Sequence, residues 1–140
     1  MHNFKFAMKW LLGILFVLAG ANHFVQPEFY VPIMPPYLPW PWSLVYLSGA
    51  FEIALGAFLL WPRTTVIAAW GLIALLIAVF PANVHMALHV EDFPTIPPIM
   101  LWLRLPLQGV LIAWAYWFTR GRRKGGSNFS ADVSRVGMLN

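Results

Sequence analysis

Ionisable side chains interrupt the apolar stretches of this sequence at only a few points. Glu52 lies within one stretch, Arg104 lies within another, and His23 lies at the end of a third. Ionisable groups inside membrane-spanning helices are costly, so they usually mark a functional site and have a partner. A carboxyl or an imidazole can exchange protons there, and a guanidinium can hold a ligand oxygen. We therefore predict that His23 and Glu52 are proton-exchanging catalytic residues.

Further polar residues fall at a similar depth in the same stretches. Ser48 lies four residues before Glu52, and Gln108 lies four residues after Arg104, so each pair shares one helix face. If these faces converge, they form a polar layer beneath one membrane surface. That layer would either bind a polar head group or fasten the helices together. Its further members would be Asn22, Ser48, Asn83, His85, Arg104 and Gln108.

The simplest contact within this layer is an ion pair between Glu52 and Arg104. A buried carboxylate without a partner takes up a proton and a buried guanidinium cannot readily lose one, so pairing satisfies both. His23, His85 and Glu52 would bind a metal only if three helices aimed them at one point, which nothing in their spacing requires. We predict the ion pair and no metal site.

The sequence contains no cysteine, which excludes disulfides, thiolate metal sites, thiol redox centres and cysteine nucleophiles. A redox role would therefore need another electron carrier. Four of the nine basic residues lie at positions 120–124, directly after an apolar stretch. Such a run is typical of a membrane flank, so we predict a lipid bilayer as partner and no nucleic acid.

The composition predicts the elements that position these residues. Of the 140 residues, 60% are hydrophobic and only 10% are charged, whereas a soluble domain has about 25% charged residues. A helix needs about 20 mostly apolar residues to cross a bilayer. Four segments qualify, at about 6–24, 43–61, 65–86 and 99–119. We predict an all-α fold, a four-helix transmembrane bundle that forms one membrane domain over residues 1–119.

The distribution of Lys and Arg predicts the orientation of this bundle. Lys5 and Lys9 precede the first span, Arg63 separates the second from the third, and the run beginning at Arg120 follows the fourth. Positive flanks favour the cytoplasmic side. We expect both termini to be cytoplasmic, a proline-rich outer loop at 26–42 and a basic, flexible cytoplasmic tail at 120–140. The protein would be a multi-pass protein of a bacterial plasma membrane. The first span also resembles a cleavable secretory signal, and that alternative stays open.

Small residues and prolines indicate how the helices pack. Small residues allow membrane helices to approach closely, and Pro106 would either kink the fourth helix or begin a shorter one. The small residues at helical spacing are Gly13 and Gly20, Gly49 and Gly56, and Ala74 and Ala78.

Four short motifs, taken together, resemble the DoxX-like family of small four-helix membrane proteins over about residues 6–119. They are Gly-Ala-Asn-His-Phe-Val-Gln-Pro at 20–27, Ser-Gly-x-x-Glu at 48–52, Phe-Pro-Ala-Asn-x-x-Met at 80–86 and Arg-Leu-Pro-Leu-Gln at 104–108. The resemblance implies that His23, Glu52, Asn83, Arg104 and Gln108 occupy the family's polar motif positions. It also implies a link to quinone-linked oxidation of sulfur compounds, to membrane oxidoreductase complexes or, in eukaryotic relatives, to receptor assembly.

Three functions stay open at this point. The first is a quinone-interacting subunit of a membrane oxidoreductase system, with quinone as the cofactor and a membrane or peripheral oxidoreductase as partner. The second is a non-enzymatic assembly or interaction protein. The third is a small-solute transporter, which would need a homodimer to supply the usual inverted repeat. The residues do not decide whether the protein is an enzyme.

Overall fold

The structure of the protein is a computed structural model that describes residues 2–120. Its four long helices are α1 (His2–Val25), α3 (Pro41–Leu60), α4 (Thr65–Leu88) and α5 (Pro98–Thr119). All four are long and apolar enough to cross a membrane. The predicted all-helical fold with four long apolar helices is therefore confirmed for this part of the chain. Of the predicted tail, positions 121–140 lie outside the described residues.

Short helical turns occupy the connections between the long helices. The proline-rich connection contains α2 (Pro27–Tyr30) and the 3-10 turn η1 (Val31–Ile33). Its last residue, Trp40, has a left-handed backbone with a φ of 52° and precedes the proline that begins α3. A second 3-10 turn, η2 (Val90–Asp92), follows α4. Much of the predicted proline-rich loop at 26–42 is thus helical.

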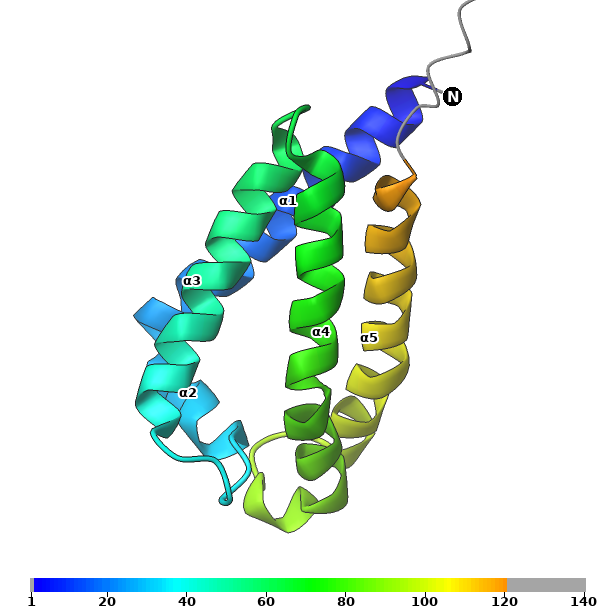
Figure 1. The fold of residues 1–140 in the computed structure, drawn as a ribbon. Coiled ribbons are helices and arrows are strands. Elements are labelled where there is room, and N and C mark those ends of the chain that lie inside the picture. The colour runs from blue at the N-terminus through cyan, green and yellow to red at the C-terminus, as the bar shows by residue number, and fades with distance from the viewer. Residues whose placement is uncertain (1, 121–140) are drawn as a thin grey trace, which may run out of the picture.

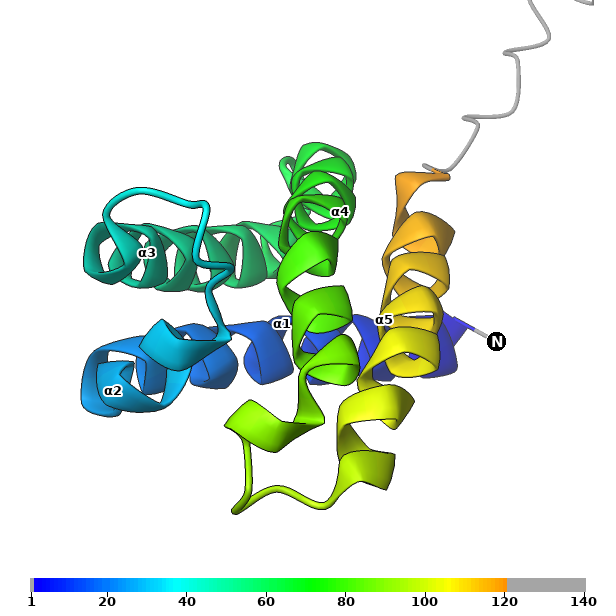
Figure 2. The same ribbon diagram turned by 90° about the horizontal axis from the view of Figure 1, so that it is seen from below.

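The long helices form two side-by-side pairs. Figure 1 and Figure 2 show α1 beside α3 and α4 beside α5, with the axes of the two pairs crossing. The pairs spread apart toward the end of the bundle that carries α2. The start of α1 and the end of α5 lie together at the opposite end. The helix pairs thus lie near each other at one end of the bundle, the closed end, and diverge toward the other.

Glycines bring α1 and α3 into backbone contact. A Cβ atom on Gly20 would lie 2.6 Å from the carbonyl oxygen of Gly49, and one on Gly56 would lie 2.8 Å from the carbonyl oxygen of Gly13. Real Cβ atoms essentially never approach so closely, so only glycine fits this crossing. The predicted glycine contacts are confirmed.

The alanine pair on α4 does not behave like the glycine pairs. Ala74 and Ala78 are both exposed on the outer face of the bundle, so the prediction that they form a close helix contact is wrong. Their neighbours Leu72, Ile73 and Leu76 are buried instead. At the level of Ala74 and Ala78, the buried face of α4 therefore consists of large side chains.

Two prolines lie inside long helices without ending them. Pro81 lies inside α4 and Pro106 lies inside α5. The alternative in which Pro106 begins a shorter fourth helix is wrong, because α5 already begins at Pro98. A proline removes one helical hydrogen bond, so Pro81 leaves the carbonyl of Ile77 without its usual donor. Both prolines lie beside the polar side chains described next.

Candidate ligand pocket

A cavity of about 400 Å³ lies where the two helix pairs spread apart. All four long helices contribute to its wall, and η1 contributes Ile33. Small-molecule sites usually have volumes of about 300–1,000 Å³, apolar walls and a few polar groups. Six residues of the predicted polar set do line this one: His23, Ser48, Glu52, Asn83, Arg104 and Gln108.

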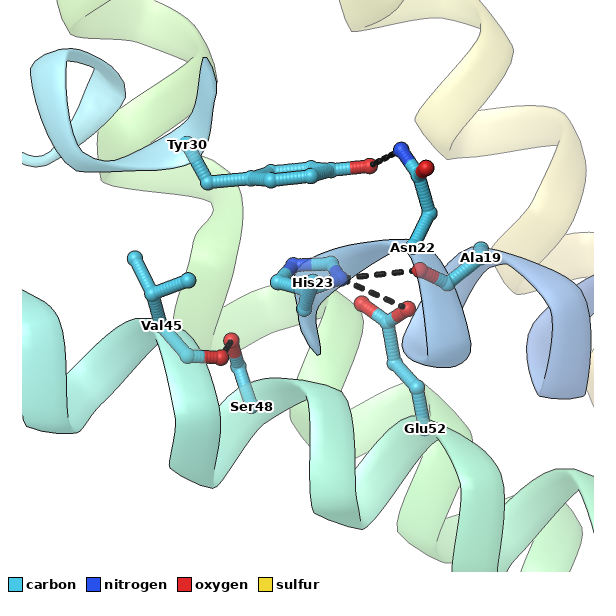
Figure 3. Close-up of polar contacts among 7 residues, drawn as sticks. All are labelled: Ala19, Asn22, His23, Tyr30, Val45, Ser48 and Glu52. Carbon is cyan, nitrogen blue, oxygen red and sulfur yellow. Dashed lines mark hydrogen bonds and ion pairs between the residues drawn. The ribbon is translucent and has the colours of Figure 1, made fainter. Parts of the chain in front are cut away.

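His23 and Glu52 face each other across the contact between α1 and α3. Nδ1 of His23 lies 2.9 Å from the carbonyl oxygen of Ala19. A carbonyl can only accept, so Nδ1 carries the hydrogen and donates it, which leaves Nε2 as the acceptor of a neutral ring. Oε2 of Glu52 lies 3.8 Å from the same Nδ1 (Figure 3), which is too long for a hydrogen bond. The two groups are thus neighbours, with the imidazole held by its own helix.

Tyr30 covers the imidazole of His23. The two rings are stacked, with centroids 3.8 Å apart and planes 19° from parallel. The phenol oxygen of Tyr30 accepts a hydrogen bond of 2.8 Å from Nδ2 of Asn22 (Figure 3). Asn22 therefore does not line the cavity itself but fixes the position of Tyr30, which does. The same hydrogen bond holds α2 against the end of α1.

A chain of side-chain amides joins α4 to α5 on the other wall. Nδ2 of Asn83 donates to Oε1 of Gln108 over 2.8 Å, and Oδ1 of Asn83 accepts from Nε of Arg104 over 3.3 Å. Nε2 of Gln108 donates to the backbone carbonyl of Leu76. That carbonyl is adjacent to the one that Pro81 leaves without a helical donor. Gln108 is almost fully buried and ties the two helices together at this level.

The predicted ion pair between Glu52 and Arg104 does not form. Among the residues that the structure describes, the ionisable neighbour of Glu52 is the imidazole of His23, 3.8 Å away, and Arg104 bonds to Asn83 instead. Glu52 and Arg104 both line the cavity, but they come from different helix pairs, Glu52 from α3 and Arg104 from α5. Oε2 of Glu52 is buried and has no hydrogen-bond partner within residues 2–120.

Two members of the predicted set have other surroundings. His85 does not line the cavity; its ring lies 4.2 Å from that of His89, centroid to centroid. Ser48 lines it, but its hydroxyl donates to the carbonyl of Val45 in its own helix (Figure 3). Over residues 2–120, no group of three or more His, Cys, Asp or Glu side chains could hold a metal ion.

Tyr30 and Met34 are among the residues of this site that could not be predicted from the sequence. From its sequence, Tyr30 is expected to be one of several aromatic residues at the membrane interface, and Met34 belongs to the proline-rich segment. Both nevertheless line the cavity. Tyr30 lies seven residues after His23, across a helix end at Gln26. Periodicity cannot relate two residues on separate elements. The clue that was present is Pro27, because proline at a first helical position indicates that a new helix begins there.

The chain belongs to a family described as a domain of unknown function (DUF8561), whose model matches residues 12–119. The match covers all six predicted residues that line the cavity. No curated protein matches the chain, and no solved structure matches it.

Proposed function

We propose that this member of the DUF8561 family binds the head group of a quinone in its cavity and serves as a subunit of a membrane oxidoreductase system. The observation that carries the proposal is Glu52: a buried carboxyl beside an imidazole, in the wall of a largely apolar cavity of about 400 Å³. Perturbed or buried ionisable groups that line a cavity are candidates for proton exchange.

The polar groups match the chemistry of a quinone. Reduction of a quinone to a quinol takes up two electrons and two protons, and its head group offers two carbonyl oxygens as acceptors. Glu52 and His23 would exchange protons at one oxygen. Arg104, which lines the cavity from α5, uses only Nε within the described residues, so its terminal nitrogens can donate to the other. The electrons would come from a partner oxidoreductase, because the chain has no cysteine.

The same proposal includes location and orientation. The basic residues at the closed end of the bundle favour the cytoplasmic side for both termini, and the cavity then lies beneath the outer surface of a bacterial plasma membrane. A quinone head group resides near that depth. The resemblance of four motifs to DoxX-like proteins supports the link to quinone-linked oxidation.

The test is mass spectrometry of quinone that copurifies with the protein from bacterial membranes. Wild type should retain quinone, and Glu52→Gln should retain far less. The matched control is Glu28→Gln, because Glu28 is an exposed acid on α2 that does not line the cavity. Absence of quinone from the wild type, or equal retention in Glu52→Gln, would contradict the proposal.

The second candidate is a non-enzymatic assembly protein. The observation that favours it is the amide chain through Asn83, whose bonds to Gln108 and Arg104 tie helices together as structural contacts do. An empty cavity in the wild type, together with loss of folded protein in Glu52→Gln and capture of one stoichiometric membrane partner, would favour this candidate.

A further inference from the structure

A second cavity lies at the closed end of the bundle, remote from Glu52. Its volume is about 340 Å³, and its wall combines the start of α1, the end of α5 and the start of α4. His2, Lys5 and Lys9 reach it from one face of α1, at spacings of three and four residues, and Arg120 reaches it from the end of α5. Four cationic or imidazole side chains thus surround one hollow.

Contacts with neighbouring residues hold the lysine side chains in place and leave hydrogen-bond donors of their ammonium groups unused. Nζ of Lys9 donates to the carbonyl oxygen of Leu60 over 3.2 Å and has two further hydrogens to give. Nζ of Lys5 lies 5.6 Å from the ring centroid of Trp117, within cation–π distance. Such contacts pre-position the ammonium groups, which lowers the entropy lost when an anion binds.

Within residues 2–120, no carboxylate lines this cavity. Four acidic residues occur in the described part of the chain, and none of them lines the cavity. Helix α4 also begins there, because Thr65 and Val66 are its first residues and both line the wall. The N-terminus of a 24-residue helix carries a partial positive charge that favours anions.

The apolar part of the wall indicates which anion fits. Phe6, Val66 and Phe118 line the same hollow, and the long helices that form it are apolar enough to cross a membrane, so we expect this end of the bundle at a membrane surface. Basic pockets between transmembrane helices at this level bind phospholipid head groups. We infer that this cavity binds the phosphate of an anionic membrane phospholipid, with Lys5, Lys9 and Arg120 as its ligands.

The test is native mass spectrometry of the full chain, released from detergent micelles that contain phosphatidylglycerol or phosphatidylcholine. Wild type should retain phosphatidylglycerol in preference to phosphatidylcholine. Each basic residue near an anionic lipid contributes about 1 kcal/mol, so Lys5→Gln and Lys9→Gln should each reduce retention about fivefold. The matched control is Arg63→Gln, because Arg63 is exposed at the same end of the bundle and does not line the cavity.

Three results would overturn this inference. One is equal retention of the two lipids by the wild type. Another is an equal loss in Arg63→Gln, which would mean that only the overall charge of this end matters. The third is displacement of phosphatidylglycerol by millimolar inorganic phosphate, which would identify free phosphate as the ligand. If Lys9→Gln fails to fold, Lys5→Gln decides the question, because the contacts of Lys5 are with rings and not with backbone. Because Lys5, Lys9 and Arg63 do not line the first cavity, quinone retention should be unaffected by these variants, and the two sites are tested separately.

Discussion

Asn83 uses both ends of its amide within the bundle. Its nitrogen donates to Gln108 on α5, and its oxygen accepts from Arg104 one turn earlier on the same helix. Ser48, by contrast, gives its hydrogen to Val45 within its own helix. Both residues line the cavity, yet only Asn83 joins two elements. The consequences of losing each side chain should therefore differ.

We expect Asn83→Leu to lower the free energy of unfolding by about 1–3 kcal/mol, because it leaves acceptor and donor groups of Gln108 and Arg104 without partners in an apolar setting. Ser48→Ala should cost about 1 kcal/mol or less, since it removes one local bond. Denaturation titrations in mixed detergent micelles measure both. A smaller loss in Asn83→Leu than in Ser48→Ala would contradict the assigned roles.

The members of the polar layer could be predicted from sequence, but their partners could not. His23, Glu52, Asn83, Arg104 and Gln108 are conspicuous because polar residues are rare in these stretches. An ion pair between Glu52 and Arg104 was predicted because it would satisfy both charges. The choice between that pair and the observed one depends on how far two helix pairs spread apart, which no spacing along one helix reveals.

At the scale of elements, the crossing of α1 and α3 depends on glycine. Gly20 and Gly49 bring the two backbones together directly beside Glu52 and His23. The distance between the carboxyl and the imidazole is therefore fixed by a contact of main chains. A change at this crossing should alter both the stability of the bundle and the cavity wall.

We expect Gly20→Ala to lower the free energy of unfolding by about 1–3 kcal/mol, because its new Cβ would lie 2.6 Å from a backbone oxygen. The matched control is Gly109→Ala on α5, where a Cβ meets nothing within 4 Å. That variant should be neutral or gain up to about 1 kcal/mol from helix propensity. The same denaturation titration compares them. Equal effects of the two changes would contradict the packing argument.

The long helices could be predicted from length and hydropathy, but their packing faces only in part. Each predicted span overlaps an observed helix, because a bilayer sets how many apolar residues must be consecutive. Gly20 and Ala78 show that the sequence did not reveal which small residues lie at a helix contact. Both belong to small residues at helical spacing, yet one lies at a helix crossing and the other is exposed. In a chain this apolar, lipid-facing and partner-facing sides are alike in hydropathy.

At the scale of the whole molecule, the two ends of the bundle differ in charge and in openness. The closed end carries Lys5, Lys9 and Arg63, and the end toward which the helix pairs spread apart carries Glu28 and Glu91. A membrane protein with this asymmetry should insert in one orientation. The proposed site then lies nearer the outer surface than the inner one.

The absence of native cysteine allows a direct test of this orientation. We expect Glu91→Cys to react with a membrane-impermeant maleimide in intact spheroplasts, and Arg63→Cys to react only after the membrane is opened. Both positions are exposed in connections between helices, so burial does not explain a difference. Labelling of Arg63→Cys in intact spheroplasts would contradict the proposed orientation.

If the cavity between the helix pairs holds a quinone head group, a larger side chain that fills the cavity should prevent the quinone from binding. Ala82 lines the cavity, whereas Ala78 is exposed on the same helix one turn earlier. Quinone should copurify with the wild type and with Ala78→Leu, and should be lost from Ala82→Leu while that variant remains folded. Equal quinone retention in the two leucine variants would contradict the claim.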